Sequence, residues 1–113
     1  MLQDWKDFLG KGASAIGTLA KGNPELMQGY VGMGKGSATR NVLGPKVREL
    51  IALAVAATTR CDTCIAVHVA EAVKQGATRE EVLEALTVAV ELNAGAALVY
   101  SSRILDAYDQ FKS

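Results

Sequence analysis

Residues 44–86 read GPKVRELIALAVAATTRCDTCIAVHVAEAVKQGATREEVLEAL and contain the start and stop signals of successive helices. Pro45 suits the first turn of a helix over about 45–59, because a backbone N–H is not needed there. Gly76 is a ready C-terminal end for a second helix that begins near the two cysteines. Thr78 and Glu81 have the spacing of a capping box, which marks the start of a third helix.

Helix signals also flank this stretch on both sides. An N-terminal helix is predicted from the segment DWKDFLGKGASAIGTLAKG. Pro24, which follows the good cap residue Asn23, predicts the start of the next helix. Four glycines in that second helix either weaken it or allow another backbone to approach it closely. After a break at Asn93 and Gly95, a C-terminal amphipathic helix is expected. We therefore predict an all-α small helical bundle of about five to six helices, with residues 1–113 forming a single domain.

The charge balance limits the class of partner. Twelve basic and twelve acidic residues cancel, so no global field would attract nucleic acid or an anionic membrane. No apolar run approaches the roughly 20 residues that cross a bilayer, and the N-terminus carries acidic residues where a signal peptide is basic. A cytoplasmic location is expected, where a close cysteine pair is more often chemical or metal-binding than structural.

The helices over LIALAVAA and LTVAVELNAGAALVY are apolar around most of their circumference. A small bundle needs one apolar stripe per helix, so a monomer would leave part of this surface in water. Large exposed apolar patches on water-soluble proteins mark interfaces. The sequence therefore predicts a homo-oligomer in which alanine and glycine allow close packing of helices.

The segment RCDTCIAVH, residues 60–68, holds both cysteines and the single histidine of the chain. On a helix, offsets of three and seven residues place Cys61, Cys64 and His68 within a sector of about 60°. Cys61 stands near the helix N-terminus, where free N–H groups favour thiolate over thiol. His68, one turn after Cys64, is placed to accept its proton. This arrangement suits a dithiol that cycles through a disulfide.

Other interpretations of these residues remain open at this stage. The cysteines could be small buried apolar residues, or they could hold zinc with His68 and a carboxylate, although the chain has no second Cys/His pair. His68 could be a structural histidine bonded to a carbonyl. Glu49 could share a solvated face with Arg48, or it could be partly buried and exchange protons near neutrality.

The chain resembles the carboxymuconolactone decarboxylase superfamily, specifically its alkylhydroperoxidase D-like branch, in the three segments RELIALAVA, CDTCIAVH and QGATREEVLEAL. The likeness runs from about residue 43 to 100, and Glu49, Cys61, Cys64 and His68 match the spacing of the branch position by position. The resemblance implies an all-α fold assembled as trimers or hexamers. It also implies a redox cycle, so we expect an oxidoreductase that acts on peroxide. We expect no cofactor and no bound metal.

In the cycle that the resemblance implies, Cys64 is deprotonated through His68 and Glu49 and reduces a hydroperoxide. Cys61 then condenses with the oxidised Cys64 into a disulfide, which an external dithiol reduces. The position of Cys61 at the positive end of the helix dipole instead makes Cys61 the more acidic thiol. For the attacking sulfur we follow the family, which assigns Cys64. A disulfide reductase, a metal-binding or redox-sensing oligomer and a non-redox lactone decarboxylase are the alternatives.

Two features of this chain depart from the family pattern. Some peroxidatic members carry histidine or tyrosine directly before the second cysteine, where this chain has Thr63, so one proton carrier is missing. The glycine-rich first 40 residues match no substrate pattern. Decarboxylase members lack the cysteine pair, which argues against lactone decarboxylation here.

Overall fold

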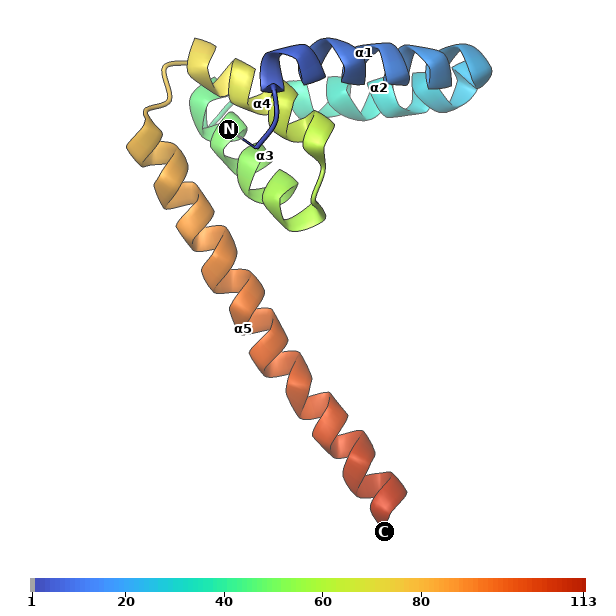
Figure 1. Cartoon of the computed structure of the whole chain (residues 1–113), viewed down its shortest axis with the longest axis vertical. Coiled ribbons are helices and arrows are strands. Elements are labelled where there is room, and N and C mark those ends of the chain that lie inside the picture. The colour runs from blue at the N-terminus through green and yellow to red at the C-terminus, as the bar shows by residue number, and fades with distance from the viewer. Residues whose placement is uncertain (1) are drawn as a thin grey trace.

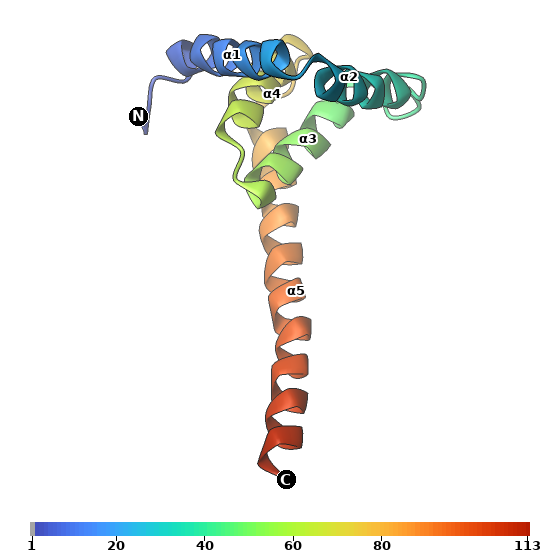
Figure 2. The same ribbon diagram turned by 90° about the vertical axis from the view of Figure 1, so that its right-hand side faces the viewer.

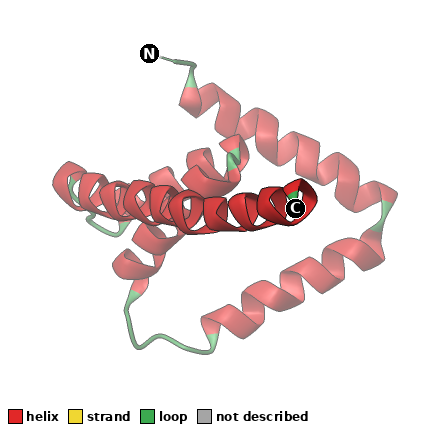
Figure 3. Ribbon diagram, turned by 90° about the horizontal axis from the view of Figure 1, so that it is seen from below, coloured by secondary structure: helices red, strands yellow, loops and turns green. Residues whose placement is uncertain are grey.

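A computed structural model describes residues 2–113 and contains five helices joined by short loops (Figure 1). The described residues form only helices and loops, as Figure 3 shows, which confirms the expected all-α fold. The helices in chain order are α1 (Trp5–Gly22), α2 (Pro24–Ala38), α3 (Pro45–Thr59), α4 (Asp62–Lys74) and α5 (Arg79–Lys112).

The predicted caps define the helix starts. The side chain of Asn23 accepts the N–H of Leu26 at 3.1 Å at the start of α2. At the start of α5, the N–H of Thr78 donates to Glu81 Oε1 at 2.9 Å, and the N–H of Glu81 donates to Thr78 Oγ1 at 3.1 Å. The capping box is thereby confirmed, and it satisfies two backbone donors that the helix itself leaves unpaired.

A tight turn joins α3 to α4 and sets the direction of α4. Arg60 ends α3 in the left-handed conformation, with φ of 56°, which is uncommon for a residue with a side chain. The N–H of Cys61 donates to the carbonyl of Ala56 at 3.2 Å across this turn. Because the chain reverses within two residues, Cys61 becomes the N-cap of α4 immediately after α3 ends.

The break expected at Asn93 and Gly95 is wrong, since α5 is one continuous helix of 34 residues. Asn93 keeps a helical backbone, and its side-chain amide donates to the carbonyl of Ala89 at 2.7 Å and to Thr58 Oγ1 of α3 at 2.8 Å. A methyl group added to Gly95 would meet no atom within 4 Å, so nothing in the chain requires a turn there. Apolar residues on both sides allow the helix to continue.

α3 is the central helix, because it packs against both α4 and α5, while α1 packs on α4 and on α2. The buried apolar residues are small, and they are Leu53, which is the largest, and Ala56, Ala66, Ala72 and Ala89. The glycines of α2 face open space, so they admit no other helix of the chain. The core of one chain is therefore thin.

α5 leaves the other helices and its C-terminal half extends alone, as two perpendicular views show (Figures 1 and 2). The radius of gyration is 18.4 Å, against about 13 Å for a compact chain of this length. The accessible surface is 9117 Å², against roughly 6,000 Å² for a compact monomer of this mass. A single chain thus exposes far more surface than a compact monomer of the same mass.

α5 is also long and apolar enough to cross a bilayer by length and composition alone. That criterion is weak, because Glu91 interrupts its apolar stretch and only 11 residues, 92–102, separate Glu91 from Arg103. A membrane span needs about 20 consecutive apolar residues. The charged positions along α5 fit a helix that packs on protein better than one that spans lipid.

The ion pair between Lys46 and Glu81 makes the stability of the fold depend on pH. Lys46 Nζ lies 2.8 Å from Glu81 Oε2 and links the start of α3 to the start of α5. This hydrogen bond, followed by that from the Thr78 N–H, lowers the pKa of Glu81 from 4.5 to about 2. The carboxylate therefore stabilises the folded state above pH 4.5, and this contribution is lost as the pH falls toward 2.

We expect Glu81→Gln to lower the free energy of unfolding at pH 7, since it removes the ion pair and weakens the capping box. The difference from the wild type should shrink as the pH falls from 4.5 toward 2, measured by urea unfolding at several pH values. Glu84→Gln, an exposed change one turn later, is the control. A difference that stays constant down to pH 2 would contradict the assignment.

Candidate active site

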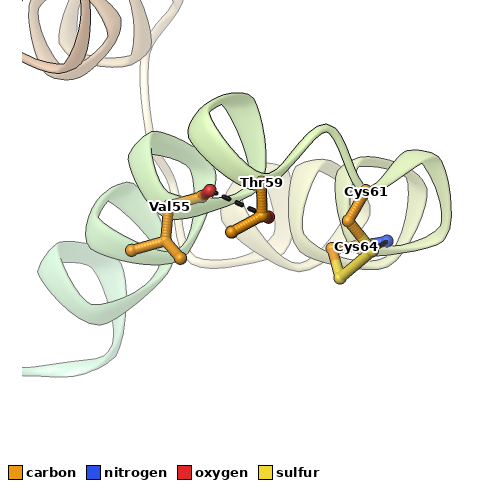
Figure 4. The surroundings of a disulfide bond; sticks show 4 residues. All are labelled: Val55, Thr59, Cys61 and Cys64. Atoms are coloured by element: carbon orange, nitrogen blue, oxygen red, sulfur yellow. Dashed lines mark hydrogen bonds between the residues drawn. A yellow bond between two sulfur atoms is a disulfide. The ribbon is translucent and has the colours of Figure 1, made fainter. Parts of the chain in front are cut away.

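The two cysteines meet at the start of α4 and form a disulfide (Figure 4). Their Cα atoms lie 5.2 Å apart, within the range that a disulfide spans. The N–H of Cys64 donates to Cys61 Sγ at 3.2 Å, so this sulfur is the N-cap acceptor of α4. In the reduced protein the same N–H would favour a thiolate at Cys61.

Glu49 of α3 and His68 of α4 come together across the contact between the two helices. His68 Nδ1 lies 2.7 Å from Glu49 Oε2, a hydrogen bond between residues 19 apart in the sequence. The carboxylate side chain is 18% exposed and the imidazole 37% exposed. Glu49 therefore does not stand on a solvated face, and it bonds the one histidine of the chain.

This hydrogen bond assigns roles to the two ring nitrogens of His68. An ionised carboxylate accepts only, so Nδ1 carries the proton that it donates to Glu49. Nε2 is then the free basic nitrogen of the neutral ring. The carboxylate also stabilises the imidazolium that forms when Nε2 takes a proton. The pair can therefore accept and return one proton at Nε2.

The four predicted residues lie on two adjacent helices. Cys61, Cys64 and His68 belong to α4 or its cap, and Glu49 belongs to the facing side of α3. Both cysteines are half-buried. The structure brings the cysteines together and, separately, the glutamate and the histidine, with His68 one turn beyond Cys64.

Arg48 has a structural role that its sequence neighbourhood did not reveal. Its guanidinium donates to the carbonyls of Ser37 at 3.0 Å and Arg40 at 2.7 Å, and to Ser37 Oγ at 2.7 Å. These bonds tie the end of α2 and the following loop to α3. Arg48 thus fixes the helix that carries Glu49, whereas position alone had suggested a solvated side chain.

The residues of 2–113 offer no group of three or more His, Cys, Asp or Glu placed to hold a metal ion. Both sulfurs are bonded to each other, and the carboxylate nearest to His68 is engaged by Nδ1. A metal at this position would need at least three protein ligands to converge. The geometry gives the zinc alternative no support.

Residues 24–107 match the model of the carboxymuconolactone decarboxylase family. The chain belongs to this family. The match extends the resemblance at both ends and covers all of α2, α3 and α4. Residues 1–23, which include α1, lie outside it.

The chain is similar to several known proteins over most of its length. An uncharacterized protein of Haemophilus influenzae is 50% identical over 113 residues and covers all of both chains. An uncharacterized protein in the cox locus of Paracoccus denitrificans is 33% identical, covering 88% of this chain and 90% of its own. An apo crystal structure of a carboxymuconolactone decarboxylase family protein from Legionella pneumophila superposes with a TM-score of 0.71 at 33% identity, covering 96% and 97% of the two chains.

Thr63, the residue before the second cysteine of this family member, packs against α1. A Cβ added at Gly12 would lie 3.1 Å from both Cγ2 and Oγ1 of Thr63, so the two helices touch there. The side chain of Thr63 is therefore a packing contact between α4 and α1 in this chain.

We expect Gly12→Leu to lower the free energy of unfolding by about 1–3 kcal/mol, because it forces α1 away from Thr63. Chemical denaturation followed by circular dichroism measures this change. Gly10→Leu is the matched control, since its added side chain enters open space and improves helix propensity. Equal effects of the two substitutions would show that α1 does not rest on α4 at Gly12.

Proposed function

We propose that this chain is a thiol-dependent hydroperoxide reductase whose redox centre is the Cys61–Cys64 pair. The observation that carries the proposal is a disulfide at the start of α4 with a Glu49–His68 hydrogen bond in the same helix pair. Membership in a family named for an enzyme supports catalysis in general. The cysteines supply the redox step, and the Glu49–His68 pair supplies the base.

In the first half of the cycle, Cys64 acts as the nucleophile. His68 Nε2 takes the thiol proton, directly or through a water, and the thiolate attacks the terminal oxygen of an organic hydroperoxide. The O–O bond breaks, the alkoxide takes the proton back from His68 and leaves as an alcohol, and Cys64 becomes a sulfenic acid. The sulfur is oxidised by two electrons and the peroxide is reduced by two.

In the second half, the thiolate of Cys61 attacks the sulfur of the Cys64 sulfenic acid. The S–O bond breaks, the departing hydroxide takes up the proton that Cys61 released on ionising and leaves as water, and the disulfide forms. An external dithiol then attacks this disulfide, passes through a mixed disulfide and leaves oxidised, which restores two thiols. A reducing cytoplasm supplies such dithiols.

A second candidate function is reduction of disulfides in other molecules, and the N-cap geometry of Cys61 favours it. Cys61 Sγ accepts the N–H of Cys64 at 3.2 Å and lies half-exposed at a helix start. Dithiol reductases use a thiolate in this environment to open a foreign disulfide. In that function Cys61 attacks, and Cys64 releases the mixed disulfide.

We expect pre-reduced protein to lose two thiols per chain and form an intramolecular disulfide when an organic hydroperoxide is added. Cys64→Ser should lose the rapid reaction because it removes the nucleophile. Cys61→Ser should stop after one equivalent of peroxide, because the sulfenic acid has no partner thiol. Stopped-flow thiol titration and mass spectrometry with a sulfenic-acid trap measure both outcomes.

The two serine variants control each other, because each removes one sulfur at nearly constant volume. Full dithiol-dependent peroxide reduction in both would refute the peroxidase. Rapid reduction of a disulfide substrate by wild type, a mixed disulfide that accumulates on Cys61 in Cys64→Ser, and no reaction in Cys61→Ser would assign the second candidate function instead.

We expect Glu49→Gln to slow the oxidation of Cys64 by about 100-fold near neutral pH, because the imidazole loses the carboxylate that orients Nδ1 and stabilises its charged form. The deficit should close above about pH 8.5, where the thiol ionises without help. The rate of thiol loss against pH measures this. Glu84→Gln is the control, and an unchanged pH profile in Glu49→Gln would make the pair purely structural.

A further inference from the structure

The hydroxyl of Thr59, the last residue of α3, lies beside the redox pair. Figure 4 shows its side chain in the surroundings of the Cys61–Cys64 disulfide. Two peptide units separate Thr59 from Cys61, so their Cα atoms lie at most about 7.6 Å apart. Thr59 is also exposed, so a small molecule can reach it from water. A polar group that the proposed cycle does not use is therefore available at the redox centre.

A hydrogen bond within α3 fixes the direction of this hydroxyl. Thr59 Oγ1 donates to the carbonyl of Val55 at 3.0 Å (Figure 4). The single proton of the hydroxyl is used in this bond, and the lone pairs of the oxygen remain as acceptors. The neighbouring Thr58 differs, because its oxygen already accepts the side-chain amide of Asn93 at 2.8 Å. Among the described residues, no donor occupies the Thr59 oxygen.

The Thr59 acceptor and the Glu49–His68 pair lie at opposite ends of the site. Thr59 stands at the turn where α3 ends and α4 begins, whereas Glu49 lies ten residues earlier and contacts His68 at 2.7 Å. Since the chain reverses at Arg60, the start of α4 that carries Cys64 lies between these two groups. A molecule bound at Cys64 thus has an acceptor on one side and a proton carrier on the other.

An organic hydroperoxide needs both kinds of group. Its terminal oxygen, which the thiolate attacks, carries a proton and is a hydrogen-bond donor. Its inner oxygen leaves as an alkoxide and needs a proton from a general acid. An acceptor that holds the terminal O–H places the reacting oxygen about 3–3.5 Å from the sulfur, the separation from which attack is fast.

We propose that Thr59 Oγ1 accepts the terminal O–H of the hydroperoxide and holds that oxygen against Cys64, an inference that rests on the proposed peroxidase. The Cys64 thiolate forms the S–O bond to the terminal oxygen, the O–O bond breaks, and the inner oxygen takes the proton from His68. The terminal oxygen keeps its own proton and becomes the hydroxyl of the sulfenic acid, still bonded to Thr59. Thr59 neither gains nor loses a proton, so it acts as a substrate-binding residue.

The test compares two reagents in a Cys61→Ser background, where Cys64 is the only thiol. Thr59→Val removes the hydroxyl and keeps the branched shape, and it should slow the reaction of Cys64 with cumene hydroperoxide by about ten-fold, the effect of one lost hydrogen bond. Its reaction with iodoacetamide should be unchanged, because that reagent is attacked at carbon and has no O–H. Stopped-flow kinetics and mass spectrometry of Cys64 measure both rates.

Two further variants serve as controls. Thr59→Ser keeps the hydroxyl and should react with cumene hydroperoxide at the rate of the parent. Thr18→Val removes an exposed hydroxyl that makes the same kind of bond, to the carbonyl of Ser14 in α1, and should leave both rates unchanged.

The inference is overturned by an unchanged peroxide rate in Thr59→Val, or by a Thr59→Ser variant as slow as Thr59→Val. It is also overturned if Thr59→Val slows both reagents equally, because Thr59 would then act on the sulfur and not on the peroxide. A parent protein that reacts with iodoacetamide but not with the hydroperoxide would refute the peroxidase and this inference together. A reactive parent with an equally reactive Thr59→Val would refute this inference alone.

Discussion

The contact between α3 and α4 is the constraint on which the rest of the structure depends. A left-handed residue, Arg60, turns the chain between the two helices, and the N–H of Cys61 closes the turn on the carbonyl of Ala56. The same turn sets Cys61 as the cap of α4 and aligns α4 so that His68 faces Glu49 of α3. Helix geometry and site geometry are thus consequences of one short connection.

The helix starts could be predicted from sequence because each depends on local hydrogen bonds. Asn23 and the Thr78–Glu81 box satisfy free N–H groups of their own helices, and the residues responsible lie three positions apart. The grouping of both cysteines with the histidine followed from helical periodicity in the same way. The pairing of Glu49 with His68 needed the family spacing, because it crosses between helices.

The errors came where tertiary contacts override local preference. Asn93 and Gly95 are typical of a helix end, yet the side chain of Asn93 bonds both its own helix and Thr58 of α3, which keeps α5 straight. Nothing in the local sequence indicated that Arg48 would donate hydrogen bonds to the end of α2 and to the loop between α2 and α3. The contact of Thr63 with Gly12 also depends on how α1 approaches α4, which no local pattern contains.

The positions of the two sulfurs reconcile two arguments that conflicted in the sequence. Cys61 Sγ already accepts a backbone N–H, which favours its thiolate and makes it a good leaving group and a ready partner for a sulfenic acid. Cys64 lies one turn from His68, and a thiol that retains its proton until a base removes it is the stronger nucleophile once ionised. The more acidic sulfur and the attacking sulfur therefore need not be the same atom. In the proposed cycle Cys64 meets the peroxide, and the Cys61 thiolate then attacks the sulfenic acid that forms on Cys64.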